Sequence, residues 1–300
     1  MLADSEVPQL LKRSHIRSGY RPLNQSWRYY IVSAFIIHNE FINIWTHLVS
    51  LIYLCYAYVH SELQTDRPRL PLLLLYFGIF SLFACSALAH LMHSRSPLDH
   101  IFWYLIDFAG IAVFSVSVGL QRYTCAQQLS TVVEVIFLPG LLLIALLLQF
   151  LSSSYLFVCR PYWPPRIHIR AASCLLLTCW LYWPLLQRYS SFDQGDFSLS
   201  LHTRAFIWLL ISGFFISGQI PERFAPGLFD FFGYGHQLFH VCIIMVTWNL
   251  CEAAHLDCSY SDTITSNNRH LSSIVCLILT LAVIVSSIKN LMKSAKCICY

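Results

Sequence analysis

The chain alternates between long apolar runs and short polar links from residue 41 to its C-terminal region. A helix needs about 20 apolar residues to cross the hydrocarbon core of a bilayer, and most of these runs reach that length. The pattern predicts eight membrane-spanning helices, at about 41–60, 71–91, 101–120, 131–151, 171–188, 205–220, 235–251 and 271–291. We therefore expect an all-α, polytopic membrane helix bundle, with a seven-helix core and an eighth, C-terminal span.

Two of the runs carry further signals. Pro184 lies in the short fifth run and predicts a kink, because proline cannot donate a helical hydrogen bond. Gly213 and Ser217 lie four residues apart in the sixth run, and this small-residue spacing predicts a close helix contact. Ahead of the first run, apolar residues recur at helical spacing between Trp27 and Phe35, which predicts an amphipathic helix at the membrane surface.

These elements divide the chain into three parts. Residues 1–40 form an N-terminal region with the interfacial helix, 41–251 a seven-transmembrane core, and 252–300 an outer loop, the eighth span and a short basic tail. The N-terminal sequence lacks the basic-then-apolar order of a secretory signal, so we expect the first region to stay attached.

Composition agrees with a membrane protein and excludes an ordinary soluble domain. Hydrophobic residues make up 57% of the chain and charged residues 11%, against about 25% charged in soluble domains. We expect the lipid bilayer as its surroundings and no nucleic-acid partner. Most of the 12 cysteines lie in apolar runs and are interpreted as core residues. Cys125 and Cys258 fall in expected loops and could pair, although nothing in the pattern argues that they do.

The basic residues predict the orientation. With the N-terminus in the cytosol, 13 of the 19 lysines and arginines lie on the cytosolic side, as the positive-inside rule favours. An even number of spans places the C-terminus there too. We expect a multi-pass protein of the plasma membrane with both termini in the cytosol. The basic residues expected in the cytosol include Arg160, Arg166 and Arg170, which lie in the loop between the fourth and fifth spans. This loop could dock a signalling partner.

Three histidines and an aspartate converge at the cytosolic leaflet in this topology. His90 ends the second span, and Asp107 lies about two turns into the third. His236 and His240, four apart on one helix face, begin the seventh. Ser86 lies one turn from His90 on the same face.

Three imidazoles with an open fourth position are typical of a catalytic zinc site. Asp107 could bind the metal directly or hold a zinc-bound water, whose pKa zinc lowers towards neutrality. The alternative is a buried polar cluster that ties three helices together without a metal. Other polar residues give weaker signals. We interpret His38, Asn39 and Glu40 as the polar start of the first span, and His93, Arg95 and His100 as solvated loop residues.

An ordered set of motifs then gives a resemblance. The set comprises Gly19-Tyr20-Arg21-Pro22-Leu23, His38-Asn39-Glu40, Asn43-Ile44-Trp45-Thr46-His47, Ser86-Ala-Leu-Ala-His90, Leu105-Ile106-Asp107-Phe108-Ala109-Gly110, Pro221-Glu222-Arg223 and Gly235-His236-Gln237-Leu238-Phe239-His240. It covers residues 19 to about 250 and resembles the progestin and adipoQ receptor family. The phrases around Gly19 and Pro221, with the eighth span, resemble its membrane progestin receptor branch.

The resemblance implies a seven-helix core with a cytosolic N-terminus and a zinc site near the inner leaflet. It implies His90, His236 and His240 as the metal ligands and Asp107 as the residue that holds the zinc water. Ser86 matches the serine of a motif shared with the alkaline ceramidase superfamily. All five positions are filled in this chain.

Two classes of function follow. In the first, the chain is a membrane receptor for a steroid (a progestin) or another lipid, which signals to a cytosolic G protein or adaptor. In the second, it is a lipid amidohydrolase in which zinc-bound hydroxide attacks an amide such as that of ceramide. Asp107 would then act as base, and Ser86 would contact the intermediate. A structural zinc protein of the membrane is a third reading.

Overall fold

The computed structural model describes residues 1–126, 129–191, 196–261 and 267–299. These residues form helices and no named strand, and a single isolated bridge pairs Leu2 with Tyr20. The predicted all-α class is therefore confirmed. The α-helices are α1 (Trp27–Ser33), α2 (Phe41–Leu54), α3 (His60–Leu63), α4 (Leu70–Met92), α5 (Pro97–Cys125), α6 (Thr131–Leu142), α7 (Ser152–Cys159), α8 (Arg166–Tyr182), α9 (Leu186–Ser191), α10 (Phe197–Gly218), α11 (Gly235–Ser261) and α12 (Asn267–Cys299).

Short helices of other types join or extend these elements. The π-helical segments Cys55–Val59 and Leu143–Leu151 continue α2 into α3 and α6 into α7 without a break. The 3₁₀ helices are Asp4–Glu6, Gln9–Leu11, His93–Arg95 and Trp183–Leu185.

Seven helical segments within the described residues are long and apolar enough to cross a membrane. They match seven of the eight predicted runs, including the C-terminal one. The run predicted at 171–188 is divided instead: α8 has 17 residues, and the 3₁₀ helix that contains Pro184 separates it from α9. Pro184 lacks the N–H that would continue the α-helix, and the helix is interrupted at this residue, where the sequence predicts a kink.

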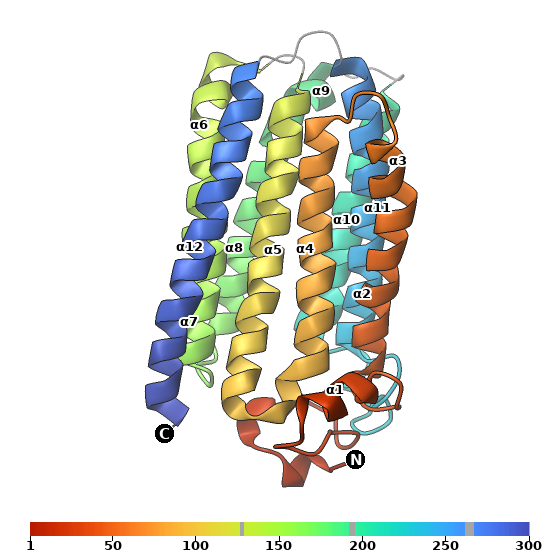
Figure 1. Cartoon of the computed structure of the whole chain (residues 1–300), viewed down its shortest axis with the longest axis vertical. Helices are drawn as coiled ribbons and strands as arrows, with labels where there is room; N and C mark the ends of the chain where they lie inside the picture. The colour runs from red at the N-terminus through yellow and green to blue at the C-terminus, as the bar shows by residue number, and fades with distance from the viewer. Residues whose placement is uncertain (127–128, 192–195, 262–266, 300) are drawn as a thin grey trace.

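The long helices run side by side along the length of the molecule (Figure 1). The N-terminal segment, residues 1–40, folds across the end of the bundle where α4 ends and α5 begins, and its helix α1 lies at this same end. We call this end of the molecule the N-terminal end of the bundle. The C-terminus of α12 is at this end too (Figure 1).

The seam between α4 and α5 positions the site described below. A Cβ on Gly110 of α5 would lie 2.8 Å from the Cβ of Cys85 on α4, so only glycine allows this close approach. The close contact predicted at Gly213 is wrong, because a Cβ there would meet nothing within 4 Å.

A disulfide joins α5 to α11 at the opposite end of the bundle. Cys125 is the last residue of α5 and Cys258 lies in the last part of α11, with their Cα atoms 5.5 Å apart. The pairing that the sequence left open is therefore present. Both cysteines lie in helices, because α5 and α11 extend several residues beyond the predicted spans.

Candidate metal centre

The three histidines come from two helix ends that meet at the N-terminal end of the bundle. His90 lies in the last turn of α4, whereas His236 and His240 lie in the first turns of α11. Gly235 begins α11 where the backbone is crowded: a Cβ there would lie 2.7 Å from the carbonyl oxygen of Phe215. Its N–H donates a hydrogen bond of 2.6 Å to Glu222, which fixes the start of the helix.

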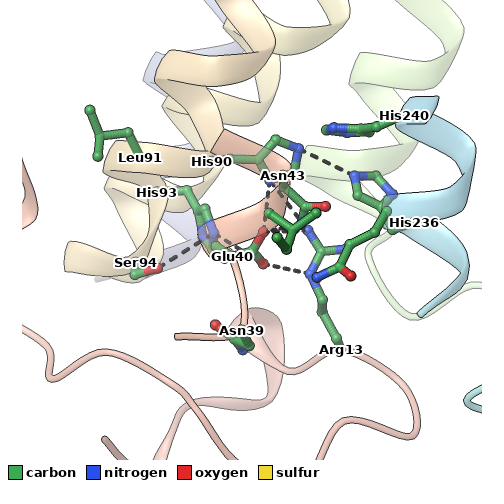
Figure 2. Close-up of polar contacts among 12 residues, drawn as sticks. Arg13, Asn39, Glu40, Asn43, His90, Leu91, His93, Ser94, His236 and His240 are labelled. Atoms are coloured by element: carbon green, nitrogen blue, oxygen red, sulfur yellow. Dashed lines mark hydrogen bonds and ion pairs between the residues drawn. The ribbon is translucent and has the colours of Figure 1, made fainter. Parts of the chain in front are cut away.

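The imidazole rings face one another at short distances. The Nε2 atoms of His90 and His236 are 3.2 Å apart, and the ring centroids of His236 and His240 are 4.7 Å apart (Figure 2). Each ring offers a nitrogen, and these three atoms lie within 4.8 Å of one another. His90 and His240 are buried and His236 is half-buried. The predicted convergence of the three histidines is therefore confirmed.

Two of the rings are held through their other nitrogen. Nδ1 of His90 lies 2.8 Å from a carboxylate oxygen of Glu40, and Nδ1 of His240 lies 3.1 Å from the hydroxyl of Thr46. Metal-binding histidines usually have such a partner, which orients the ring and leaves the opposite nitrogen free for the metal. Glu40 and Thr46 both belong to the start of α2, which therefore supports both rings.

Glu40 is a buried hub of polar contacts (Figure 2). Arg13 donates to both of its carboxylate oxygens, at 2.5 and 3.1 Å, and Asn43 donates to Oε2. Burial alone would raise the pKa of the Glu40 carboxyl, but the charge of Arg13 and the contact with His90 outweigh it, so the pKa lies well below its usual range. The sequence pattern indicates Glu40 only as the polar start of a span. The structure corrects this interpretation, because Glu40 is buried and contacts His90.

Arg13 reaches the site from the N-terminal segment. Its guanidinium also donates to the hydroxyl of Tyr104 on α5, at 3.0 Å, and lies 3.5 Å from Nδ1 of His90. In the sequence Arg13 is one of the 13 basic residues expected on the cytosolic side, with no further signal. No spacing rule could place it here, because the contact depends on how the N-terminal segment folds back onto the bundle.

Arg21 holds the backbone at the end of α4, next to His90. Its buried guanidinium donates to the carbonyl oxygens of His90 and Leu91, at 2.7 and 2.6 Å, and to the hydroxyls of Ser33 and Ser94. A positive charge that donates hydrogen bonds to the free carbonyl oxygens stabilises the C-terminal end of α4. Burial lowers the pKa of Arg21 to about 10, which leaves it charged at neutral pH. This arginine belongs to a motif that the sequence analysis used only for the resemblance.

Asp107 and Ser86 form a second pair beside the histidines. Both side chains are buried, and Ser86 on α4 lies close to Asp107 on α5. Among the described residues, the group of ring nitrogens that lie within 4.8 Å of one another does not include a carboxylate oxygen of Asp107. The structure thus brings the three histidines into direct contact and places Asp107 and Ser86 next to them.

His93 and His100 are buried, so their interpretation as solvated loop residues is wrong. Their Nδ1 atoms lie 3.1 Å apart, and Nε2 of His93 lies 3.6 Å from Glu40. The error arises because both rings pack against other segments: His93 against Glu40, and His100 against Phe157 of α7, with ring centroids 5.9 Å apart. Arg95 is partly exposed and pairs with Asp99 at 3.0 Å.

The residues present fit a zinc ion. Zinc favours neutral imidazole nitrogens, and three of them with an open fourth position form a common site. Two of these three rings have their outer nitrogen held, as a metal site requires. A second group, made of Glu40, His90 and His93, also lies within 4.8 Å. It fits less well, because both oxygens of Glu40 already accept hydrogen bonds from Arg13.

The chain matches known proteins over most of its length. The haemolysin-III related family matches residues 35–251. Membrane progestin receptor alpha-B of Danio rerio is 35% identical over 266 residues, which cover 84% of this chain and 75% of that protein. Membrane progestin receptor beta of Mus musculus is 30% identical over 269 residues, which cover 85% and 75%. The chain therefore belongs to the haemolysin-III related family, with membrane progestin receptors among its homologues, and the resemblance to the progestin and adipoQ receptors is confirmed.

Proposed function

We propose that this chain is a membrane receptor for a steroid of the progestin class, with zinc held by His90, His236 and His240. The names of its relatives, which share 30–35% of its residues over most of its length, support the ligand class. The three facing imidazole rings at the end of α4 and the start of α11 support the metal site. When bound, zinc supplies a Lewis acid that links these two helices.

The disulfide supports the proposed orientation. Disulfides persist in oxidising compartments and are rare in the cytosol. Cys125 and Cys258 lie at the end of the bundle opposite the N-terminal segment, so this end faces the outside and the histidines lie near the cytosolic leaflet. This agrees with the orientation that the basic residues predict and with a place in the plasma membrane.

The cytosolic end offers a surface for a G protein or adaptor. Arg160 is exposed after α7 and Arg166 begins α8, so both could meet such a partner. Arg170, which the sequence analysis grouped with them, lies over the ring of Phe108 at 4.6 Å, inside the bundle. We therefore propose Arg160 and Arg166 for this surface and leave Arg170 out of it.

Saturable binding of radiolabelled progesterone to the reconstituted chain tests the receptor proposal. We expect binding that a non-progestin steroid such as cortisol does not displace at equal concentration. Binding that does not saturate would contradict the proposal, whatever the metal content of the protein.

A lipid amidohydrolase is the second candidate, and the Ser86–Asp107 pair favours it. The pair lies beside three imidazoles that leave one metal position open, which is the arrangement of a hydrolytic site. Asp107 can take a proton at its carboxylate and Ser86 can donate one from its hydroxyl, so the pair could position an amide carbonyl and its leaving nitrogen.

Hydrolysis of a fluorescent ceramide by the purified chain separates the two candidates. Wild type is compared with Asp107→Ala and with the double variant His236→Ala/His240→Ala, and zinc is measured on the same samples. Turnover that both variants lose would identify an enzyme, whereas zinc without turnover would exclude this candidate.

A further inference from the structure

A groove lies between α5 and α12 at the N-terminal end of the bundle. Its volume is about 560 Å³. The apolar part of its lining comes from Phe102 on α5 and from Ile288 and Met292 on α12. The polar part comes from α12 alone, from Lys289, Lys293 and Lys296 together with Ser286 and Asn290. None of these residues belongs to the metal centre.

The three lysines share one face of α12 and lack an acidic partner. They are spaced by four and three residues, so they lie one turn above another. All three are exposed, and no carboxylate in the described part of the chain lies within ion-pair distance of any of them. Three positive charges that no described residue of the chain balances would attract an anion to the groove.

The same face of α12 becomes apolar further into the bundle. Ile278, Leu281 and Val285 are exposed, and Val285 lies one turn before Lys289. The helix therefore presents a continuous stripe, apolar along most of its length and basic at its cytosolic end. A phospholipid has the complementary order, with acyl chains followed by a charged headgroup.

We propose that this groove binds an anionic phospholipid that carries more than one phosphate. The phosphates pair with the ammonium groups of the three lysines, and an acyl chain lies along Ile278, Leu281 and Val285. Basic pockets between transmembrane helices on the cytosolic side are suited to such headgroups. The favourable position of lysines at a helix C-terminus explains the charges, and the membrane span explains the apolar stripe, but neither explains the groove beside the lysines.

Binding of lipids to the purified full chain tests this proposal. The probes are dioctanoyl phosphatidylinositol bisphosphate, dioctanoyl phosphatidylcholine and soluble inositol trisphosphate, measured by microscale thermophoresis. We expect the anionic lipid to bind at least tenfold more tightly than either of the others. Equal binding of inositol trisphosphate would overturn the proposal in favour of a site for a soluble anion.

Three variants identify the groove. Lys289→Gln/Lys293→Gln/Lys296→Gln should weaken binding of the anionic lipid roughly 100-fold, since each lysine near the membrane surface contributes about 1 kcal/mol. The matched control is Lys12→Gln/Arg28→Gln/Arg223→Gln, which removes three exposed or partly exposed charges from the same end and should change binding by less than about threefold.

The third variant replaces the three lysines with arginines and should bind the anionic lipid as wild type does, because it keeps the charges at the groove. It also shows that substitutions on this exposed face leave the fold intact. Equal loss of binding in the glutamine variant and in its control would show general charge attraction and overturn the groove as the site.

Discussion

The guanidinium of Arg13 and the carboxylate of Glu40 form a bidentate ion pair between the N-terminal segment and the start of α2. Glu40 in turn contacts His90, so the pair connects the N-terminal segment to the histidines. A buried carboxylate is costly unless a positive charge and hydrogen bonds compensate it.

Removal of Arg13 should therefore destabilise the fold. Arg13→Met leaves Glu40 buried without its arginine partner, and we expect a loss of about 3–5 kcal/mol in the free energy of unfolding. The double variant Arg13→Met/Glu40→Leu should recover a large part of that loss, because it removes both charges. Thermal unfolding in detergent measures each variant, and a double variant no more stable than Arg13→Met would contradict the explanation.

Metal content should depend on the three facing histidines. We expect His236→Ala or His240→Ala to abolish stoichiometric zinc, as measured by elemental mass spectrometry on purified protein. His93→Ala should retain it, because His93 belongs only to the second group with Glu40 and His90. Exposed His60 provides a control at the opposite end. Zinc lost in His93→Ala and kept in His236→Ala would place the ion in the second group.

Arg21 should act on the site through the backbone of α4. Arg21→Met removes the donor to the carbonyls of His90 and Leu91, and we expect a loss on the order of 3 kcal/mol in stability. Zinc affinity should fall as well, because the end of α4 no longer holds His90 in place. Arg28→Met, at an exposed position of the same segment, should leave both quantities unchanged.

The disulfide should stabilise the outer end. Cys125→Ser/Cys258→Ser should lower the free energy of unfolding by about 2–4 kcal/mol. Dithiothreitol should lower the melting temperature of wild type by a similar shift and leave that of the variant unchanged. A reductant effect of equal size on both proteins would exclude this disulfide as its cause.

The exposed Cys297 reports the orientation of the chain. With the N-terminal end in the cytosol, a membrane-impermeant maleimide should label Cys297 only after cells are permeabilised. Cys297→Ser identifies the label that belongs to this residue. Labelling of intact cells that disappears in Cys297→Ser would invert the proposed orientation.

The sequence predicts the bundle and the three histidines for clear physical reasons. Apolar runs of membrane length determine the spans, and the alternation of direction brings the end of α4 beside the start of α11. Fixed helical spacing then places His236 and His240 on one face. These inferences need only the order of the spans, so errors of several residues at the boundaries do not disturb them.

The remaining features depend on contacts between segments that no local pattern records. Arg13 and Arg21 reach His90 only because the N-terminal segment folds across the end of the bundle. Contacts with Glu40 and with Phe157 of α7 bury His93 and His100, which the sequence presents as an ordinary polar turn. Gly213 shows the converse error, because small-residue spacing marks a helix contact only where a second helix packs against it.

The cover formed by the N-terminal segment also affects how an ion would exchange. Arg13 lies against His90 and Tyr104, so an ion held by the three rings would lie behind this segment on the cytosolic side. Because His236 stays half-buried, the segment would slow removal by chelators rather than block it, even where equilibrium favours removal. Loading would occur most readily during biosynthesis, before residues 1–40 dock, and a mature protein would retain the metal by slow release as well as by affinity.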